Sequence, residues 1–321
     1  MNGLLAGIDI GGTKCAVSLA TSDGEQVIII ARQSFPTPAT PDATIHALID
    51  TLRALLADQQ QPLAAIGISC GGPLDSARGV VLSPPNLPGW VDVPVVAAFT
   101  QAFGVPATIQ NDANAGALAE WLWGAGKGCH NLIFLTFGTG MGAGLILNGQ
   151  LYSGTNDMAG EVGHIRLAED GPIGYGKAGS FEGFCSGGGI QRLAMARAEA
   201  ALKAGNPPDF CPTEADLPSI TTEKVANSDD PLAHEIFELV GRRLGQGLAI
   251  LIDVLNPQRI IIGSIYLRQR QRLEAAMQTA LKQEALSYAL GVCEILPAGL
   301  GESIGDYAAL AVASYGQQYL D

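Results

Sequence analysis

The sequence lacks the features that mark membrane and secreted proteins. No apolar stretch approaches the roughly 18 residues that cross a bilayer, and no basic segment precedes the apolar residues near the N-terminus. The six cysteines are scattered singly, without a Cys-x-Cys or Cys-x₂-Cys pair. We therefore expect a cytoplasmic protein with reduced core thiols, without a signal peptide and without a membrane partner.

Positive charge is also scarce. Lys and Arg number 18 against 31 Asp and Glu, which gives a net charge of −13, and no run rich in Lys or Arg occurs. Because nucleic-acid surfaces cluster these two residue types, we expect no nucleic-acid partner. An acidic chain can still bind phosphates locally through backbone amides and Mg²⁺.

The composition that is present indicates a globular enzyme. Apolar residues make up 47% of the chain, charged residues only 15%, and 41 glycines are spread along it. A length of 321 residues allows about two domains of ~150 residues each. Two domains favour a cleft between them.

An internal duplication is the strongest organisational signal. Apolar strands are expected at 3–10, 15–20 and 26–34, and again at 131–137, 143–147 and 150–152. In both sets a tight glycine and threonine turn joins the first two strands. The pattern predicts two copies of one supersecondary unit.

The remaining periodic segments complete a mixed α/β pattern. We expect further strands at 64–69, 105–109, 259–262 and 292–296, and helices at 43–59 (capped by Asp42), 113–123, 189–204, 232–253, 267–283 and 301–315. Residues 80–90 are too rich in proline for regular structure and predict a fixed loop. The glycine-dense segment 154–189 is long for a connection, which favours a functional role.

Both glycine turns can present backbone N–H groups and a threonine hydroxyl to phosphate oxygens. They are Gly11-Gly12-Thr13 and Gly138-Thr139-Gly140. A hairpin that needs positive φ explains either turn alone equally well, but two turns in duplicated units favour phosphate binding. Asp9, just before the first turn, can hold the Mg²⁺ of a nucleotide directly or through water; capping of the turn is the alternative.

A carboxylate stands where the strand at 105–109 changes into a helix. Asn111 and Asp112 occupy this switch, where ligands collect in α/β sheets and the helix N-terminus faces outward. This position predicts a base at Asp112. The alternative is that Asn111 or Asp112 caps the helix.

Taken together, these residues resemble the ROK family of sugar kinases and sugar-responsive repressors, in the superfamily of actin and hexokinase. The resemblance runs from Gly7-Ile-Asp-Ile-Gly-Gly-Thr-Lys14 to Gly301 and the helix after it. It implies a two-domain α/β fold of the actin-like ATPase type, built from duplicated ribonuclease H-like βββαβα units around an interdomain cleft. The domains expected are residues 1–112, with a helix at about 303–321 packing back on them, and residues 113–302. We also expect a homodimer.

The resemblance assigns roles residue by residue. Asp112 matches the catalytic base. The sugar-contacting positions are matched by Gly72, Asn86, Asn111, Glu161, His164 and Glu182. The ATP-binding positions are matched by Asp9, Gly11, Gly12, Thr13, Lys14, Gly138, Thr139, Gly140, Gly263 and Ser264, with Asp9 also serving Mg²⁺.

Physical chemistry supports these roles beside the resemblance. A sugar hydroxyl has a very high pKa, so an Asp within about 3 Å must take its proton as the phosphoryl group arrives. Glu161, His164 and Glu182 supply two acceptors and one group that both donates and accepts, as a ring of hydroxyls requires. A buried, satisfied histidine is the alternative for His164.

The expected function is ATP- and Mg²⁺-dependent phosphorylation of a hexose at its 6-hydroxyl, with glucose as the first guess. N-acetylmannosamine kinase, N-acetylglucosamine kinase and fructokinase are alternatives. A sugar-binding regulatory ROK protein is the alternative from another class. Such regulators carry a DNA-binding domain before the first phosphate motif, which here starts at Gly7, so we expect none. A catalytically inactive sugar-binding protein is a further alternative.

One motif departs from the family pattern. ROK proteins usually carry Cys-x-Cys-Gly-x₂-Gly-Cys-x-Glu, whose cysteines bind a structural zinc together with the histidine that matches His164. Ile173, Tyr175 and Ser180 stand at the cysteine positions here. His164 alone cannot make a tetrahedral zinc site, so we expect packing around Tyr175 and Phe181 to hold this loop.

We therefore predict that the purified protein contains no stoichiometric zinc, because the thiolate ligands are missing. Elemental analysis after dialysis against a chelator measures this directly. One retained zinc per chain would show that the loop is misaligned, or that Cys185 and other ligands replace the missing cysteines.

Overall fold

The computed structural model describes residues 3–23 and 25–319. The ends of the predicted domains at residues 1, 2, 320 and 321 lie outside this part of the chain. Chain contacts divide the protein into two units. Unit 1 comprises Met1–Phe134, Gly144–Gly160 and Ala298–Asp321, and unit 2 comprises Leu135–Ala143 and Glu161–Pro297. The predicted division between residues 112 and 113 stays a prediction.

Two five-stranded sheets carry the fold, and they share one strand order. The first sheet runs β3-β2-β1-β4-β7, with β1 Leu4–Ile10, β2 Lys14–Ser22, β3 Val27–Pro36, β4 Leu63–Cys70 and β7 Ala107–Gln110. The second runs β10-β9-β8-β13-β14, with β8 Leu132–Phe137, β9 Met141–Leu147, β10 Gln150–Leu151, β13 Arg259–Ile262 and β14 Glu294–Pro297. Both read third, second, first, fourth and fifth strand of their set, which confirms the duplication.

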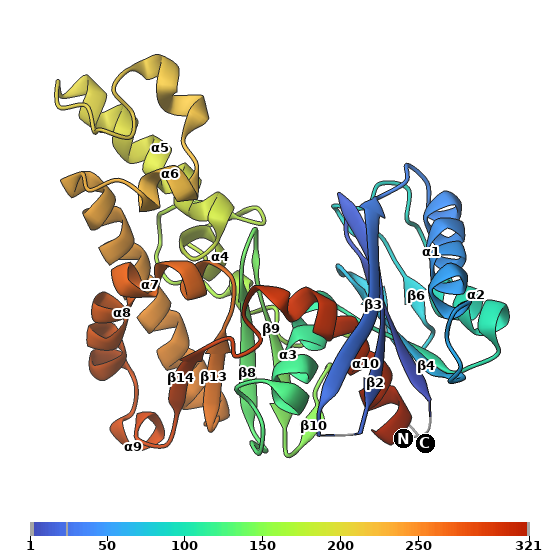
Figure 1. The fold of residues 1–321 in the computed structure, drawn as a ribbon. Coiled ribbons are helices and arrows are strands. Elements are labelled where there is room, and N and C mark those ends of the chain that lie inside the picture. The colour runs from blue at the N-terminus through green and yellow to red at the C-terminus, as the bar shows by residue number, and fades with distance from the viewer. Residues whose placement is uncertain (1–2, 24, 320–321) are drawn as a thin grey trace. The chain divides into compact units, whose positions relative to one another are not determined.

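Helices cover both faces of the first sheet, as Figure 1 shows. Side chains of α1 Pro41–Leu56 and α2 Val95–Phe103 join one buried cluster with Ile8, Ile10, Ile66 and Ile68. Leu310 and Ala313 of α10 Ile304–Tyr319 join Leu5 and Ala65 on the other face. Alternate residues of β1 therefore serve opposite faces, as strand geometry requires.

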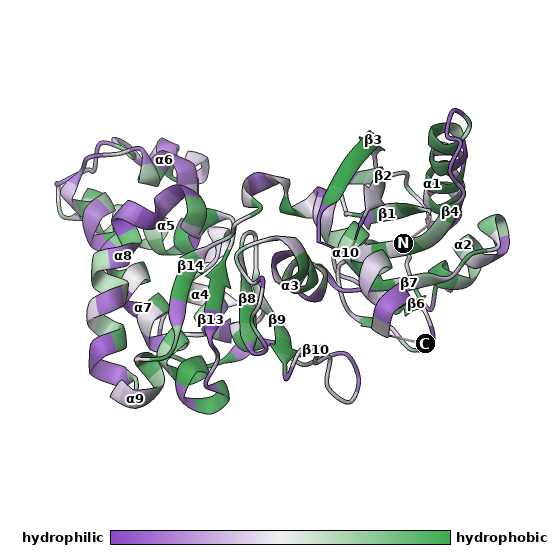
Figure 2. Ribbon diagram, turned by 60° about the horizontal axis from the view of Figure 1, so that its bottom comes forward, coloured by the Kyte–Doolittle hydropathy of each residue, from purple (hydrophilic) through white to green (hydrophobic). Residues whose placement is uncertain are grey.

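Helices also make up most of unit 2. They are α4 Phe181–Phe184, α5 Gly187–Lys203, α6 Thr222–Ala226, α7 Pro231–Leu255, α8 Ile265–Glu284 and α9 Ser287–Leu290. Gly241 and Gly245 of α7 face backbone carbonyls of α8, and a side chain at either glycine would collide with them. The two helices can therefore pack closely. Figure 2 shows α8 largely hydrophilic and β9 hydrophobic.

Unit 1 also contains α3 Asp112–Trp123 and the short pair β5 Leu74–Asp75 and β6 Val80–Val81. The segment predicted as an irregular loop at 80–90 thus begins with a two-residue strand. The remaining short elements of the chain are β11 Ile173–Gly174, β12 Lys177–Ala178, and the 3₁₀ turns Val162–His164, Glu214–Ser219 and Gly301–Ser303. No helix among the described residues is long and apolar enough to cross a membrane.

The start of α1 differs from the prediction. Asp42 was expected to cap it, but the hydroxyl of Thr40 accepts the hydrogen bond from the Ala43 amide, and Pro41 opens the helix. Proline is favoured at this position because its missing N–H has no helical partner in any case. Asp42 lies instead in the first turn, where its negative charge interacts favourably with the positive end of the helix dipole.

A close approach of α10 to the sheet gives a test of this packing. A Cβ on Gly67 would overlap the Ala309 carbonyl and the Ala313 amide, which are backbone atoms that cannot rotate away. We predict that Gly67→Ala lowers the free energy of unfolding by about 1–3 kcal/mol, the usual cost of overpacking, measured by chemical denaturation.

Gly305→Ala is the matched control, because Gly305 lies in α10 with open space around its Cα. This change should be neutral or stabilising by up to ~1 kcal/mol through helix propensity. Equal effects of the two substitutions would contradict the close packing of α10 on the sheet.

Candidate functional site

Three parallel strands of the first sheet end next to one another and carry predicted site residues. In the register of the sheet Asp9 of β1 lies opposite Ser69 of β4, and Ser69 lies opposite Gln110 of β7. The chain therefore leaves the sheet at one edge through Gly11, through Gly71–Gly72 and through Asn111–Asp112. Carboxyl ends of parallel strands are where ligands bind in α/β folds.

The first glycine turn is fixed by hydrogen bonds at Gly11, and its remaining residues are exposed to solvent. The Gly11 amide donates to the Lys14 carbonyl at 3.2 Å, and the Thr37 hydroxyl donates to the Gly11 carbonyl at 2.6 Å. Gly12 is backed by the Asn86 carbonyl, which any side chain at this position would strike. Gly12, Thr13 and Lys14 are exposed, so the backbone of the turn can be reached by a ligand.

Asn86 links this turn to the end of β4. A Cβ on Gly71 would lie 3.3 Å from both polar atoms of the Asn86 side chain, so that side chain lies against Gly71. Gly72 follows, has open space around its Cα, and precedes Pro73 through a cis peptide bond. The predicted residues Gly12, Gly72 and Asn86 are therefore neighbours in unit 1.

The helix after β7 resolves the two roles proposed for Asn111 and Asp112. Asn111 is the N-cap of α3, and its side-chain oxygen accepts from the Asn114 amide at 2.8 Å. The alternative that one of these residues caps the helix is therefore correct for Asn111, and the Asp112 side chain does not cap it. Asp112 is the first helical residue and its side chain is exposed, so the carboxylate can meet a substrate.

Like charges meet at this edge of the sheet. The pKa of Asp9 is raised from 3.8 to about 6 by burial first, then by the negative charges of Asp112 and Asp306; Lys14 and Arg32 lower it in part. The pKa of Asp112 is also raised, although its side chain reaches solvent, because surrounding atoms desolvate it. Amide hydrogen bonds at Asp112 and Ala113 offset part of that effect.

Arg32 and Asp306 are residues that sequence reasoning missed. They come from β3 and from the first turn of α10, and Arg32 Nε lies 2.6 Å from Asp306 Oδ1. Both act on Asp9 electrostatically. No local motif marks them, since 274 positions separate the pair in the sequence.

The donor set around Asp9 fits a magnesium ion that arrives with a nucleotide. The described residues contain no group of three or more His, Cys, Asp or Glu side chains arranged to hold a metal. Mg²⁺ bound with nucleotide phosphates needs only one or two protein carboxylates. A cation beside Asp9 would also relieve the repulsion from Asp112 and Asp306. The absence of a structural zinc stays a prediction.

In unit 2 the second glycine turn is fixed by three neighbours. The Gly142 amide donates to the Thr136 hydroxyl at 2.9 Å, and the Gly187 amide donates to the Gly138 carbonyl at 2.8 Å. The Met141 amide donates to Oε2 of Glu182 at 3.1 Å. Thr139, at the tip of the turn, is exposed.

Gly263 and Ser264 lie beside this second turn, and their assignment to the adenosine side stays a prediction. The Gly263 amide donates to the Leu135 carbonyl at 3.0 Å, and a Cβ on Gly138 would be 3.4 Å from the Ser264 hydroxyl. Ser264 has φ 56° and ψ −112°, a strained conformation, and its hydroxyl makes no capping bond to α8. Backbone strain of this kind is concentrated at functional sites.

Two of the predicted sugar-contacting parts of unit 2, the His164 segment and Glu182, lie against the same turn. Glu161 is exposed and precedes the 3₁₀ turn that carries His164. Gly163 of that turn lies against the Met141 carbonyl, and a Cβ there would be 3.1 Å from Cβ of Glu182. Close packing thus joins the His164 segment, the Glu182 side chain and the second glycine turn.

The packing expected around Tyr175 is wrong, whereas that around Phe181 is confirmed. Phe181 is fully buried and lies against Gly247 of α7. Tyr175 is 68% exposed, because it occupies the tip of the β11–β12 hairpin with φ 41°. Its ring meets only the edge of the His164 ring among the described aromatic contacts, with centroids 5.2 Å apart.

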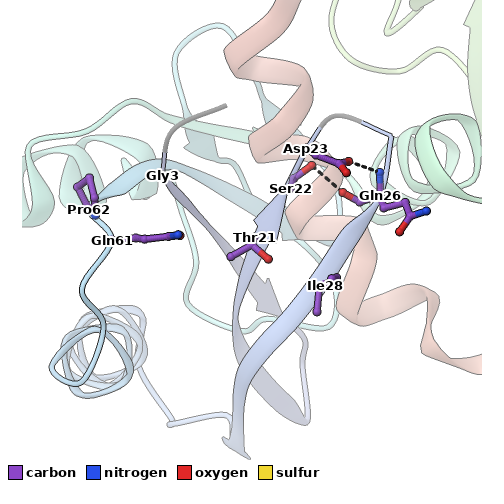
Figure 3. A pocket seen from close by; sticks show the side chains of 8 residues that line it. All are labelled: Gly3, Thr21, Ser22, Asp23, Gln26, Ile28, Gln61 and Pro62. Atoms are coloured by element: carbon purple, nitrogen blue, oxygen red, sulfur yellow. Dashed lines mark hydrogen bonds between the residues drawn. The ribbon is translucent and has the colours of Figure 1, made fainter.

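A hollow of about 500 Å³ lies at the opposite end of β2 and is lined by none of the predicted site residues. Figure 3 shows it beside the turn between β2 and β3. The Gln26 amide donates to Asp23 there at 2.8 Å, and the Ser22 hydroxyl donates to the Gln26 carbonyl at 3.0 Å. These polar groups already bind one another.

Residues 5–315 match the ROK family. The glucokinase of Streptomyces coelicolor is 33% identical over 271 residues, 81% of each chain. The DNA-binding transcriptional dual regulator NagC of Escherichia coli is 29% identical over 268 residues, 80% of this chain and 63% of the regulator.

A solved structure shows the fold. The ROK family glucokinase from Streptomyces griseus in complex with glucose and AMPPNP superposes with a TM-score of 0.77 at 29% identity, covering 98% of this chain and 100% of that one. The mixed α/β fold of this chain is therefore that of the actin-like ATPases, as the duplicated sheets also indicate.

The electrostatics of Asp9 predict a pH-dependent stability. Between pH 3.8 and about 6 the folded protein binds more protons at Asp9 than the unfolded chain, so ionisation of Asp9 costs stability as the pH rises. Asp9→Asn removes this cost. In metal-free buffer the variant should gain about 1–3 kcal/mol over the wild type above pH 7 and little below pH 4, measured by thermal unfolding.

Asp23→Asn is the control of opposite sign. Hydrogen bonds from the backbone amides of Gln26 and Glu25 lower the pKa of Asp23, so its stabilising effect is present at neutral pH and is lost in acid. A gain for Asp9→Asn that does not change with pH would rule out charge repulsion at this edge.

Proposed function

The chain belongs to the ROK family, and on that premise we propose that it is a sugar kinase that transfers a phosphoryl group from ATP to the 6-hydroxyl of an aldohexose. Glucose is the first candidate acceptor. The observation that carries this proposal is the exposed Asp112 carboxylate at the N-terminus of α3, on the same sheet edge as Asp9 and the first glycine turn. The glucokinase relatives support the reaction class.

Asp112 acts as the general base in this proposal. Its carboxylate accepts the proton of the 6-hydroxyl as that oxygen forms its bond to phosphorus, and ADP leaves with the electrons of the broken P–O bond. A raised pKa brings the basicity of Asp112 closer to the operating pH. Asn111 keeps the helix start in place through its cap, so the carboxylate is held on a rigid element.

The glycine turns and Asp9 hold the donor. When bound, Mg²⁺–ATP supplies the phosphoryl group and neutralises charge that develops on it. Amides of Gly12 and Thr13 are exposed for one set of phosphate oxygens, and Thr139 for another. In this proposal Asp9 binds the ion directly or through water, and Ser264 contacts the adenosine side.

The choice of sugar rests on Glu161, His164 and Glu182, together with Gly72, Asn86 and Asn111. A polar group that a bound sugar covers but leaves unpaired costs ~1–3 kcal/mol, so sugars that differ at the first and second carbons should be distinguished. N-acetylmannosamine and N-acetylglucosamine are the closest alternatives, and fructose is the less favoured one. A homodimer and a cytoplasmic location stay predictions.

A sugar-responsive regulator is the second candidate, because NagC is a relative of this chain. Sugar binding alone would satisfy a regulator. Asp9 favours catalysis, because a partly buried carboxylate beside the first glycine turn suits a cation that arrives with ATP, whereas binding of a neutral sugar does not need it. Turnover separates the two candidates.

We predict that Asp112→Asn lowers kcat by about 10²- to 10⁴-fold, the usual contribution of a positioned base, while the affinity for sugar changes little. Steady-state kinetics with ATP, Mg²⁺ and glucose measure this. Asp42→Asn is the matched control, because Asp42 also lies in the first turn of a helix, α1, and should leave kcat unchanged. Near-normal turnover of Asp112→Asn would exclude Asp112 as the base.

The acceptor is identified by kcat/KM for glucose, mannose, allose, fructose and both N-acetylhexosamines. We expect an aldohexose to rank first. Fructose in first place would contradict the pyranose assignment of Glu161, His164 and Glu182. Binding of a sugar without any phosphorylation would favour the regulator.

A further inference from the structure

Glu182 is positioned more rigidly than a surface carboxylate. It lies in the short helix α4, whose N-cap Ser180 is fully buried and accepts from the Gly183 amide at 3.1 Å. Phe181, its neighbour, is fully buried against α7. The backbone that carries Glu182 is therefore fixed from both sides, and its carboxylate has a defined place.

One oxygen of the Glu182 carboxylate accepts a hydrogen bond at the second glycine turn. Oε2 accepts from the Met141 amide at 3.1 Å and would be 3.0 Å from a Cβ on Gly140. The other oxygen, Oε1, has no hydrogen bond among the described residues, and Glu182 is only partly buried. The side chain thus touches the turn with one oxygen and leaves the other for a ligand.

A negative charge at this place acts against the proposed use of the turn. Phosphate oxygens drawn to the turn would approach a carboxylate that lies against Gly140, and like charges at short range repel. The Thr136 and Gly187 contacts already hold the turn, so a clamp alone does not require a charge. A hydroxyl that donates a hydrogen bond to Oε1 would hold more of the carboxylate's negative charge on that oxygen, away from the phosphate. The repulsion between Glu182 and the phosphate would then be smaller.

We propose that Glu182 makes nucleotide binding depend on the sugar. Without a sugar its charge opposes phosphate at the second glycine turn. A sugar hydroxyl that donates to Oε1 lowers this opposition, while Oε2 keeps the Met141 amide in place. Glu182 is then a positioning residue as well as a sugar contact, and it restrains futile ATP hydrolysis. This inference rests on the sugar-kinase function proposed above.

Binding of AMPPNP with Mg²⁺, measured by calorimetry with and without saturating glucose, tests the coupling. Glucose should tighten AMPPNP binding to the wild type by about 5-fold or more, the lower end of ordinary coupling between sites. Glu182→Gln removes the charge. It should tighten sugar-free AMPPNP binding by about 3- to 10-fold, and the effect of glucose should fall below about 2-fold.

His164→Gln is the matched control. His164 is a predicted sugar contact whose backbone carbonyl binds Lys177 and whose ring meets Tyr175, without a hydrogen bond to the turn among the described residues. This variant should bind glucose more weakly, yet saturating glucose should still tighten AMPPNP binding as in the wild type.

The outcomes separate this inference from the function on which it rests. If Glu182→Gln weakens AMPPNP binding equally with and without glucose, the residue is a structural clamp and the inference is wrong. An unchanged effect of glucose in Glu182→Gln also overturns it. If the wild type phosphorylates no sugar of the panel, the proposed function fails instead, whatever the variants do.

Discussion

The parallel register of β1, β4 and β7 is the constraint on which the candidate site in unit 1 depends. Because Asp9, Ser69 and Gln110 lie in one row, the three chain segments that follow them must leave the sheet side by side. Gly7 and Gly67 let α10 pack close to the middle of this sheet, since a Cβ at either would meet backbone atoms of the helix. The C-terminal helix therefore fixes the strands whose ends carry the chemistry.

That arrangement has an electrostatic cost. It brings Asp9 and Asp112 to one edge, with Asp306 close enough to raise the pKa of Asp9 further. The ion pair of Arg32 with Asp306 offsets part of this repulsion but lies partly in solvent, where such pairs contribute little. A protein selected for stability alone would not keep these carboxylates together, so their cost is an argument for function.

The sequence predicts the features that depend on local chemistry. The bounds of β13 and both glycine turns follow from apolar runs and turn residues. The helix α2 was missed because its residues are nearly all apolar and Pro94 supplies no capping side chain. A short apolar run of this kind does not distinguish helix from strand.

Other parts of the site depend on contacts that no local pattern records. Arg32 and Asp306 meet only because α10 returns to the first sheet, and Tyr175 is exposed because its hairpin tip has nowhere to bury it. The resemblance to a family supplied roles for single residues, but it could not say that Glu182 binds an amide of the glycine turn.

The duplicated units differ most in what lies behind their turns. A neutral carbonyl of Asn86 backs the first turn at Gly12, whereas a carboxylate of Glu182 lies against the second at Gly140. The two glycine turns therefore differ in the charge of the group that lies against them. The carbonyl behind the first turn carries no net charge that a second ligand could change. A turn beside a carboxylate responds to whatever else that carboxylate binds, and in the proposed kinase this asymmetry would make the binding of one substrate depend on the other.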